Sequence, residues 1–192
     1  MRQNVRHPLT MTSTPARIGI VMVVVLMFAT VGVSRGAQLI PSLGFTKSTD
    51  SSAGDGKVFG GVALRASLLR FMSLEGGIAY RDESFSNGDL KVRMWPVTAS
   101  VWLTPFPVVY AGGGLGWYRT TYDYRSSLPY NDTTTSKVGV HLGGGLAIPL
   151  APSLGLDLNG RYIFMQKDNS IQFPSKFNPD FWNASLGLAI KF

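Results

Sequence analysis

The side chains that could do chemistry here are one histidine and a scattered set of charged residues. His141 is the only histidine after His7, and the sequence has no cysteine. A metal site usually needs three or four ligands drawn from cysteine, histidine and carboxylate groups. One histidine without cysteine does not supply them, so we expect neither a metal nor a cofactor. We also expect His141 to be an interior histidine with hydrogen-bond partners rather than a catalytic base.

The charged residues lie at alternate positions in segments that are otherwise apolar or small. We expect them to line the interior of a barrel as a polar network, together with two neutral polar residues. The predicted network is Arg65, Glu75, Arg81, Glu83, Arg93, His141, Asp157, Asn159, Arg161 and Lys191.

Five of these residues are expected near one end of the barrel, where two acids would face three bases: Glu75, Asp157, Arg65, Arg161 and Lys191. An ion pathway and a plug of paired charges are both compatible with this set. Because an unpaired buried charge costs several kcal/mol, we favour the plug.

Two glycine-rich segments could be mistaken for phosphate-binding loops: "AGGGLGWY" at 111–118 and "HLGGGLA" at 141–147. The dinucleotide-binding fingerprint needs its glycines between a strand and a helix. No helical pattern follows either segment. Small residues that leave room inside a barrel explain both segments better.

The elements that must carry these residues are strands. In the final segment, "FWNASLGLAIKF", residues 182, 184, 186, 188, 190 and 192 are apolar, and the residues between them are small or polar. Period-two alternation is typical of a strand with two different faces. The whole chain predicts eight strands at about 38–46, 58–67, 71–83, 90–103, 108–122, 135–149, 154–166 and 181–192.

Connections of alternating length predict how these strands are arranged. The segments 67–70, 104–107 and 151–153 are short, whereas 47–57, 84–89, 123–134 and 167–180 are long and mostly polar. Short turns at one end and long loops at the other are typical of transmembrane barrels. We therefore predict an all-β protein, an eight-stranded antiparallel up-and-down transmembrane β-barrel with both strand termini at the periplasmic end.

A soluble barrel with an apolar interior would alternate equally well. The less apolar face here is mostly Gly, Ala and Ser with occasional charges, which suits a narrow lumen. Aromatic residues near strand ends predict interfacial girdles: Tyr80, Trp95, Trp102, Tyr110, Trp117, Tyr122, Tyr124, Phe181 and Trp182. The fourth strand changes parity at Trp95–Pro96, where we expect a bulge or a local break.

The N-terminus predicts a secretory signal, residues 1–36, ahead of a single domain, residues 37–192. Basic residues precede the apolar run 18–33, and small residues follow it at Ser34 and Gly36. A transmembrane anchor is the alternative, but the run is short for a spanning helix. Cleavage would remove four arginines and no acid, leaving 14 basic and 11 acidic side chains and a net charge of +3. This balance does not indicate nucleic-acid binding.

The mature sequence resembles the opacity-type, OmpA-like family of small outer-membrane β-barrels. The resemblance rests on the signal segment and on three stretches, 96–118, 154–164 and 182–192. It implies an outer-membrane location and contact with outer-membrane lipid or lipopolysaccharide. It also implies that the last strand is read by the barrel-insertion machinery through Trp182, Leu186, Leu188, Ile190 and Phe192.

The expected function is a non-enzymatic one, in envelope structure or surface interaction, by a monomer without nucleic-acid partners. A narrow channel for small or hydrophobic compounds, similar to OmpW-like barrels, is the first alternative. A lipid-modifying enzyme is the second, although His141 is followed by Leu-Gly-Gly, unlike the His-x-Ser-Asn arrangement of lipid deacylases. The apolar residues Ile171, Phe173 and Phe177 in the last long loop would rim a ligand entrance or pack over the barrel mouth.

Overall fold

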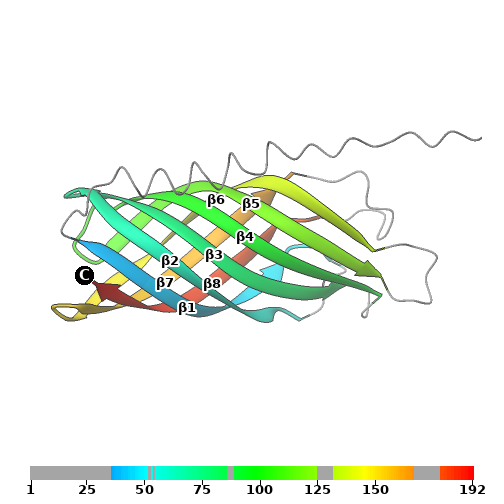
Figure 1. Cartoon of the computed structure of the whole chain (residues 1–192), viewed down its shortest axis with the longest axis horizontal. Coiled ribbons are helices and arrows are strands. Elements are labelled where there is room, and N and C mark those ends of the chain that lie inside the picture. The colour runs from blue at the N-terminus through cyan, green and yellow to red at the C-terminus, as the bar shows by residue number, and fades with distance from the viewer. Residues whose placement is uncertain (1–35, 52, 54, 86–88, 125–131, 167–177) are drawn as a thin grey trace, which may run out of the picture. The chain divides into compact units, whose positions relative to one another are not determined.

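The computed structural model describes residues 36–192, except 52, 54, 86–88, 125–131 and 167–177. These residues form a closed barrel in which each strand pairs with its sequence neighbours and β1 pairs with β8 (Figure 1). All eight pairings are antiparallel, which confirms the predicted fold. No helix in the described residues is long and apolar enough to cross a membrane. The strands are β1 (Ala37–Ser48), β2 (Lys57–Leu69), β3 (Met72–Phe85), β4 (Leu90–Leu103), β5 (Val109–Tyr124), β6 (Thr133–Ala151), β7 (Leu154–Met165) and β8 (Phe181–Lys191).

The two ends of the barrel differ in their connections. The turns after β2, β4 and β6 are short, and they share a rim with the start of β1 and the end of β8. At this rim the Phe192 backbone N–H donates to the Ala37 carbonyl oxygen at 3.1 Å. We call it the short-turn end and the opposite rim the long-connection end. The predicted signal lies outside the described residues apart from Gly36, and its removal stays a prediction.

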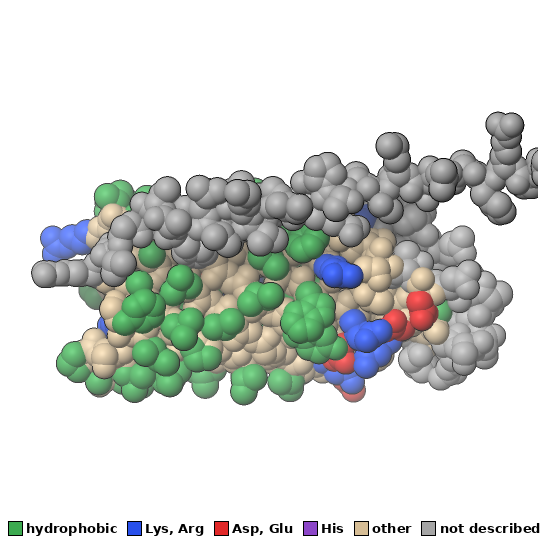
Figure 2. Space-filling model, viewed as in Figure 1, with side chains coloured by type: hydrophobic (Ala, Val, Ile, Leu, Met, Phe, Trp, Pro, Cys, Tyr) green, Lys and Arg blue, Asp and Glu red, His purple; other side chains and the backbone are tan. Residues whose placement is uncertain are grey.

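Side chains on the outer face of the wall are predominantly apolar, as the alternation predicts. In β8, Leu186, Leu188 and Ile190 are exposed, whereas Gly187 and Ala189 between them are buried. Figure 2 shows hydrophobic side chains over much of the outer face and charged side chains near the long-connection end. The apolar face of this barrel therefore faces outward, as in a membrane protein, rather than inward.

The predicted bulge at Trp95–Pro96 is absent, because the pairs Ile78↔Val97 and Arg81↔Met94 belong to one register and β4 continues across Pro96. The two residue pairs between them are missing from the β3–β4 pairing, so the predicted local break is present on that side of β4 only. The apolar residues change parity because the surroundings change. From Trp95 toward the long-connection end, the outward positions carry charge (Lys91 and Arg93), and the inward positions fill a buried apolar core (Leu90, Val92 and Met94).

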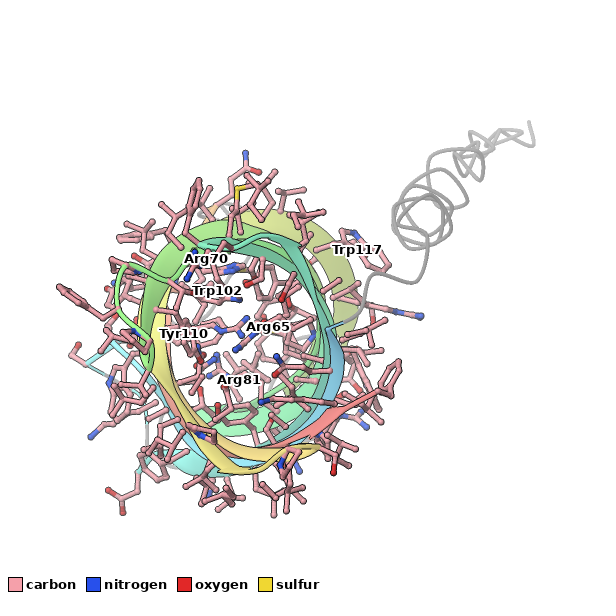
Figure 3. The ribbon with its side chains drawn as sticks, turned by 90° about the vertical axis from the view of Figure 1, so that its left-hand side faces the viewer. Arg65, Arg70, Arg81, Trp102, Tyr110 and Trp117 are labelled. Atoms are coloured by element: carbon pink, nitrogen blue, oxygen red, sulfur yellow. The ribbon has the colours of Figure 1, made fainter. Side chains whose placement is uncertain are left out.

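The predicted aromatic girdles are only partly correct. Tyr80, Trp95 and Trp182 lie on the outer face, and the Tyr80 and Trp95 rings are 4.8 Å apart. Figure 3 shows Trp117 outside the ring of strands. The lumen instead holds four residues predicted for the girdles, all at most 5% exposed: Trp102, Tyr110, Tyr122 and Phe181. Strand parity, rather than position near a strand end, decides which aromatic side chains enter the barrel.

Candidate functional site

A buried arginine on β2 is the centre of the polar network in the lumen. Arg65 Nη2 lies 2.7 Å from Glu75 Oε2 on β3, and Arg65 Nη1 lies 2.7 Å from Asp157 Oδ2 on β7. Its Nε donates to the same Glu75 oxygen at 2.8 Å. The three residues are at most 6% exposed. One guanidinium therefore joins three strands through charge-assisted bonds.

A second arginine completes the ion pairs. Arg161 Nη2 donates to Glu75 Oε1 at 2.6 Å, and its Nε donates to Asn159 Oδ1 at 2.6 Å. Glu75 thus bridges Arg65 and Arg161, with one carboxylate oxygen bonded to each. The two acids, Glu75 and Asp157, balance the two arginines in charge.

Aromatic side chains complete this cluster. The Tyr110 hydroxyl donates to Asp157 Oδ1 at 2.8 Å and accepts from Asn159 Nδ2 at 3.0 Å. The Arg65 guanidinium lies 4.5 Å from the Tyr110 ring centroid, and that of Arg161 lies 5.0 Å from the Trp102 ring. Figure 3 shows Arg65, Tyr110 and Trp102 within the ring of strands. We call the six residues the ionic cluster: Arg65, Glu75, Tyr110, Asp157, Asn159 and Arg161.

The glycine-rich segments make room for these side chains. A Cβ on Gly145 would lie 2.5 Å from the Tyr110 hydroxyl oxygen, and one on Gly143 would lie 3.0 Å from Arg161 Cγ. Both distances are shorter than ordinary van der Waals contact. The inward glycines of β6 therefore allow large side chains from β5 and β7 to fill the lumen.

His141 faces the lumen beside the ionic cluster. It is 0% exposed, and its Nε2 lies 2.9 Å from the hydroxyl oxygen of Ser100, which is itself buried. Its Nδ1 has no hydrogen-bond partner among the described residues, so no carboxylate there orients the ring as in a catalytic triad. Sequence reasoning missed Ser100, which lies 41 positions from His141.

The remaining predicted network residues fall in different places. Arg81 is buried in the lumen, with its guanidinium 3.8 Å from the Phe181 ring centroid. Lys191 lies at the short-turn rim and forms no ion pair with a described residue, so it is not part of the ionic cluster. The side chain of Glu83 lies outside what the structure describes.

Arg93 was predicted for the lumen, and this is wrong. Its side chain points outward near the long-connection end, where Nε and Nη2 donate to the two Asp123 carboxylate oxygens at 2.6 and 2.9 Å. The error follows directly from the parity change expected at Trp95–Pro96, because β4 in fact keeps one parity throughout.

Two cavities lie next to the ionic cluster. One, of about 270 Å³, is lined by Arg65 and Tyr110 together with residues of the short-turn rim. The other, of about 80 Å³, is lined by Glu75, Asn159 and Arg161 together with Tyr118 and Phe181. The ionic cluster therefore contributes to the walls of both cavities.

Apolar side chains fill the lumen toward the long-connection end. One cluster consists of Met94, Tyr118, Ile163, Met165 and Phe181. A second consists of Leu90, Val92 and Tyr122, with Ala53 and Tyr124 packed against it. We call these two groups the apolar plug. The loop residues Ile171, Phe173 and Phe177 lie outside the described residues.

The residues predicted for membrane insertion lie on one face of the last strand. Trp182, Leu186, Leu188, Ile190 and Phe192 are 38–68% exposed and point outward. This placement suits contact with lipid; their recognition by the insertion machinery stays a prediction. In the described part of the chain, no group of three or more His, Cys, Asp or Glu side chains could hold a metal ion.

Comparison with known proteins places the chain in a family. The model of the outer membrane protein beta-barrel domain matches residues 12–192. No curated protein matches the chain.

Solved structures with a similar fold include three outer-membrane barrels. Neisserial surface protein A (NspA) is 19% identical with a TM-score of 0.63, and the match covers 84% of this chain and 99% of NspA. The N-terminal β-barrel domain of Pseudomonas aeruginosa OprF is 13% identical with a TM-score of 0.55, over 82% and 99% of the two chains. Ail of Yersinia pestis, solved with the heparin analogue sucrose octasulfate, is 16% identical with a TM-score of 0.53, over 82% and 97%. The matched family and the closed barrel confirm the predicted outer-membrane location, and the chain belongs to the outer membrane protein β-barrel family.

Proposed function

We propose that this protein is a non-enzymatic barrel with a closed lumen that serves envelope structure or surface interaction in the outer membrane. The observation that carries the proposal is the ionic cluster, which bonds side chains of β2, β3, β5 and β7 to one another inside the barrel. An eight-stranded barrel has little interior space beyond its side chains. The ionic cluster toward the short-turn end and the apolar plug toward the long-connection end would together leave no continuous water path for ions.

The absence of catalytic activity is part of this proposal. Ser100 and His141 are the one hydroxyl–imidazole pair that the described residues bring within hydrogen-bond distance. Both are buried, at 3% and 0% exposure, and His141 Nδ1 lacks an orienting partner. A nucleophile needs a base that is itself oriented and a position that substrate can reach.

Planar-bilayer conductance of the purified protein tests the closed lumen. We expect the wild type to show no steady single-channel conductance. Glu75→Ala removes the bridge between Arg65 and Arg161 and should open a small leak. Steady conductance by the wild type would overturn the closed lumen and favour the channel.

A sideways route for small hydrophobic compounds is the second candidate function, and one observation favours it. Between Ile78↔Val97 and Arg81↔Met94, two residue pairs are missing from the β3–β4 pairing, at Pro96, which has no N–H to donate. Ala79 and Pro96 also line the 80 Å³ cavity. Faster uptake of an apolar dye into vesicles containing the wild type than into those containing Pro96→Val would support this route; equal rates would remove it.

We also propose that the outer wall contacts the charged headgroups of outer-leaflet lipid or lipopolysaccharide. Trp95 and Trp182 lie on the outer face; Arg93 follows Trp95 on the same face of β4 toward the long-connection end, and Lys47 on β1 pairs with Trp182. Aromatic side chains followed by cations suit the boundary between acyl chains and phosphates. Figure 2 shows this change from hydrophobic to charged side chains along the wall.

A further inference from the structure

The cavity at the short-turn end has an unusual lining. Its volume is about 270 Å³, and it is lined by three cationic residues, Arg65, Arg70 and Lys191, and by no aspartate or glutamate. Neutral side chains with hydrogen-bond donors share the lining, among them Gln38, Ser67, Ser73 and Thr104. We call this cavity the short-turn vestibule. Figure 3, which views the barrel from this end, shows Arg70 and Arg65 within the ring of strands.

Only one of the three cations has its charge balanced. Arg65 is bonded to Glu75, Asp157 and the Tyr110 hydroxyl. The two negative charges of Glu75 and Asp157 are already balanced by Arg65 and Arg161, because Arg161 also binds Glu75. Arg70 and Lys191 form no ion pair or hydrogen bond with any described side chain. The vestibule thus has two uncompensated positive charges at its mouth above a neutral floor.

Charges of one sign around a concave site concentrate counter-ions there, because the protein walls focus the field. An anion with several acceptor oxygens suits this lining, because Arg70 and Lys191 supply positive charge and Ser73 and Gln38 supply further donors. A phosphate monoester carries a charge between about −1.5 and −2 at neutral pH, close to the charge of the two cations. The volume is just below the roughly 300–1,000 Å³ of typical drug-sized ligand sites. Size and charge therefore favour a small phosphorylated group.

We propose that the short-turn vestibule binds a phosphate group between Arg70 and Lys191, with Ser73 and Gln38 as additional donors. The short turns of such barrels face the periplasm, so the ligand would enter from that side. This site is independent of whether the lumen conducts, because it lies on the periplasmic side of the ionic cluster. A free phosphate or phosphomonoester and the headgroup of a periplasmic-leaflet phospholipid are the two possible sources.

Isothermal titration of the protein, purified from outer membranes into zwitterionic detergent, tests the site with inorganic phosphate. Phosphate replaces chloride at constant ionic strength, so nonspecific screening stays unchanged. We expect saturable binding of one phosphate by the wild type. Arg70→Gln and Lys191→Gln should each weaken it about tenfold or more, the factor expected for one lost charge-assisted hydrogen bond. The double variant should show no saturation.

Arg119→Gln is the matched control. Arg119 is an exposed cation on the outward face of β5 near the long-connection end, and it forms no ion pair with a described residue. We expect this variant to bind phosphate like the wild type. Equal weakening in all three single variants, or no saturable binding by the wild type, would overturn the proposal. Unfolding midpoints without phosphate should agree among the variants, because Arg70 and Lys191 have no ion-pair or hydrogen-bond partners among the described side chains to lose.

Measurements in lipid vesicles distinguish the two possible sources of the phosphate group. Phosphate titrations are repeated in phosphatidylcholine vesicles with and without phosphatidylglycerol. One outcome is that phosphate binds more weakly in the vesicles that contain phosphatidylglycerol than in those that lack it. If the double variant removes this difference, the site is assigned to a lipid headgroup. Unchanged affinity would assign it to a soluble phosphate compound. A phosphatidylglycerol effect that persists in the double variant would show a general surface charge effect and would contradict the site.

Discussion

The two halves of the lumen are filled by different chemistry on the same wall. Toward the short-turn end, Glu75 and Asp157 neutralise Arg65 and Arg161. Toward the long-connection end, the apolar plug packs Met94, Ile163 and Phe181, and the buried Arg81 guanidinium lies over the Phe181 ring. Strand parity is the same throughout, so the difference lies in residue types alone. A barrel can thus close its interior by charge pairing or by packing, and each predicts a different sensitivity to mutation.

Glu75→Gln should have the largest effect. It keeps the size of the side chain but removes the charge that serves two arginines, leaving them in a site where Glu75 is only 3% exposed. Removing one member of a buried ion pair costs about 3–5 kcal/mol. Reversible urea unfolding in lipid vesicles measures this loss. A loss below about 1 kcal/mol would mean that lumen water solvates the arginines and that the ionic cluster contributes little to stability.

Met94→Ala probes the apolar plug. Met94 is 4% exposed and belongs to the larger of the two apolar groups. Truncating a buried methionine typically costs about 2–5 kcal/mol through lost contacts and the cavity left behind. The same unfolding assay measures it.

Leu115→Ala, on the lipid-facing side of β5, is the control for Met94→Ala, because lipid fills the space that its side chain leaves. A similar cost for Leu115→Ala would show that the plug is not packed more tightly than the outer wall.

Leu186→Arg tests the assignment of inner and outer faces on which the comparison rests. Leu186 points outward at 50% exposure, and an arginine near the bilayer midplane of a barrel costs about 2–4 kcal/mol. Ser185→Arg should cost less, since Ser185 lines the 80 Å³ cavity together with Glu75. Folding yield into vesicles and the unfolding midpoint report both effects. A larger loss of stability for Ser185→Arg than for Leu186→Arg would mean that the inner and outer faces are assigned the wrong way round.

The sequence was sufficient to predict the barrel, the strand order and most inward-facing residues. Alternation and connection lengths are local properties, and a barrel repeats them eight times. The pairing of Arg65 with Asp157, 92 positions away, could be expected only as a cluster near one end. The bridge through Glu75 and the bond to Tyr110 depend on register, which alternation does not specify.

The errors have two causes. Leu90, Val92 and Met94 point inward although they are apolar, because an apolar core fills the lumen there and charged residues occupy the outer face. A rule of apolar outside and polar inside therefore misplaces Arg93, whereas one constant parity along β4 places it correctly. Trp102 and Tyr110 are misplaced because position near a strand end does not decide the face on which an aromatic side chain lies.

Arg93→Gln should have the smallest effect, and it isolates burial as the variable. The Arg93–Asp123 pair, at 2.6 Å, is as short as the Arg65–Asp157 pair, at 2.7 Å, but its side chains are 48% and 24% exposed instead of 7% and 6%. Water solvates both partners of the exposed pair when one is removed, so little stability depends on it. We expect the unfolding midpoint of Arg93→Gln to stay close to that of the wild type and the remaining difference to vanish at high salt. A loss comparable to that of Glu75→Gln would show that pair geometry, rather than burial in the lumen, makes the ionic cluster important.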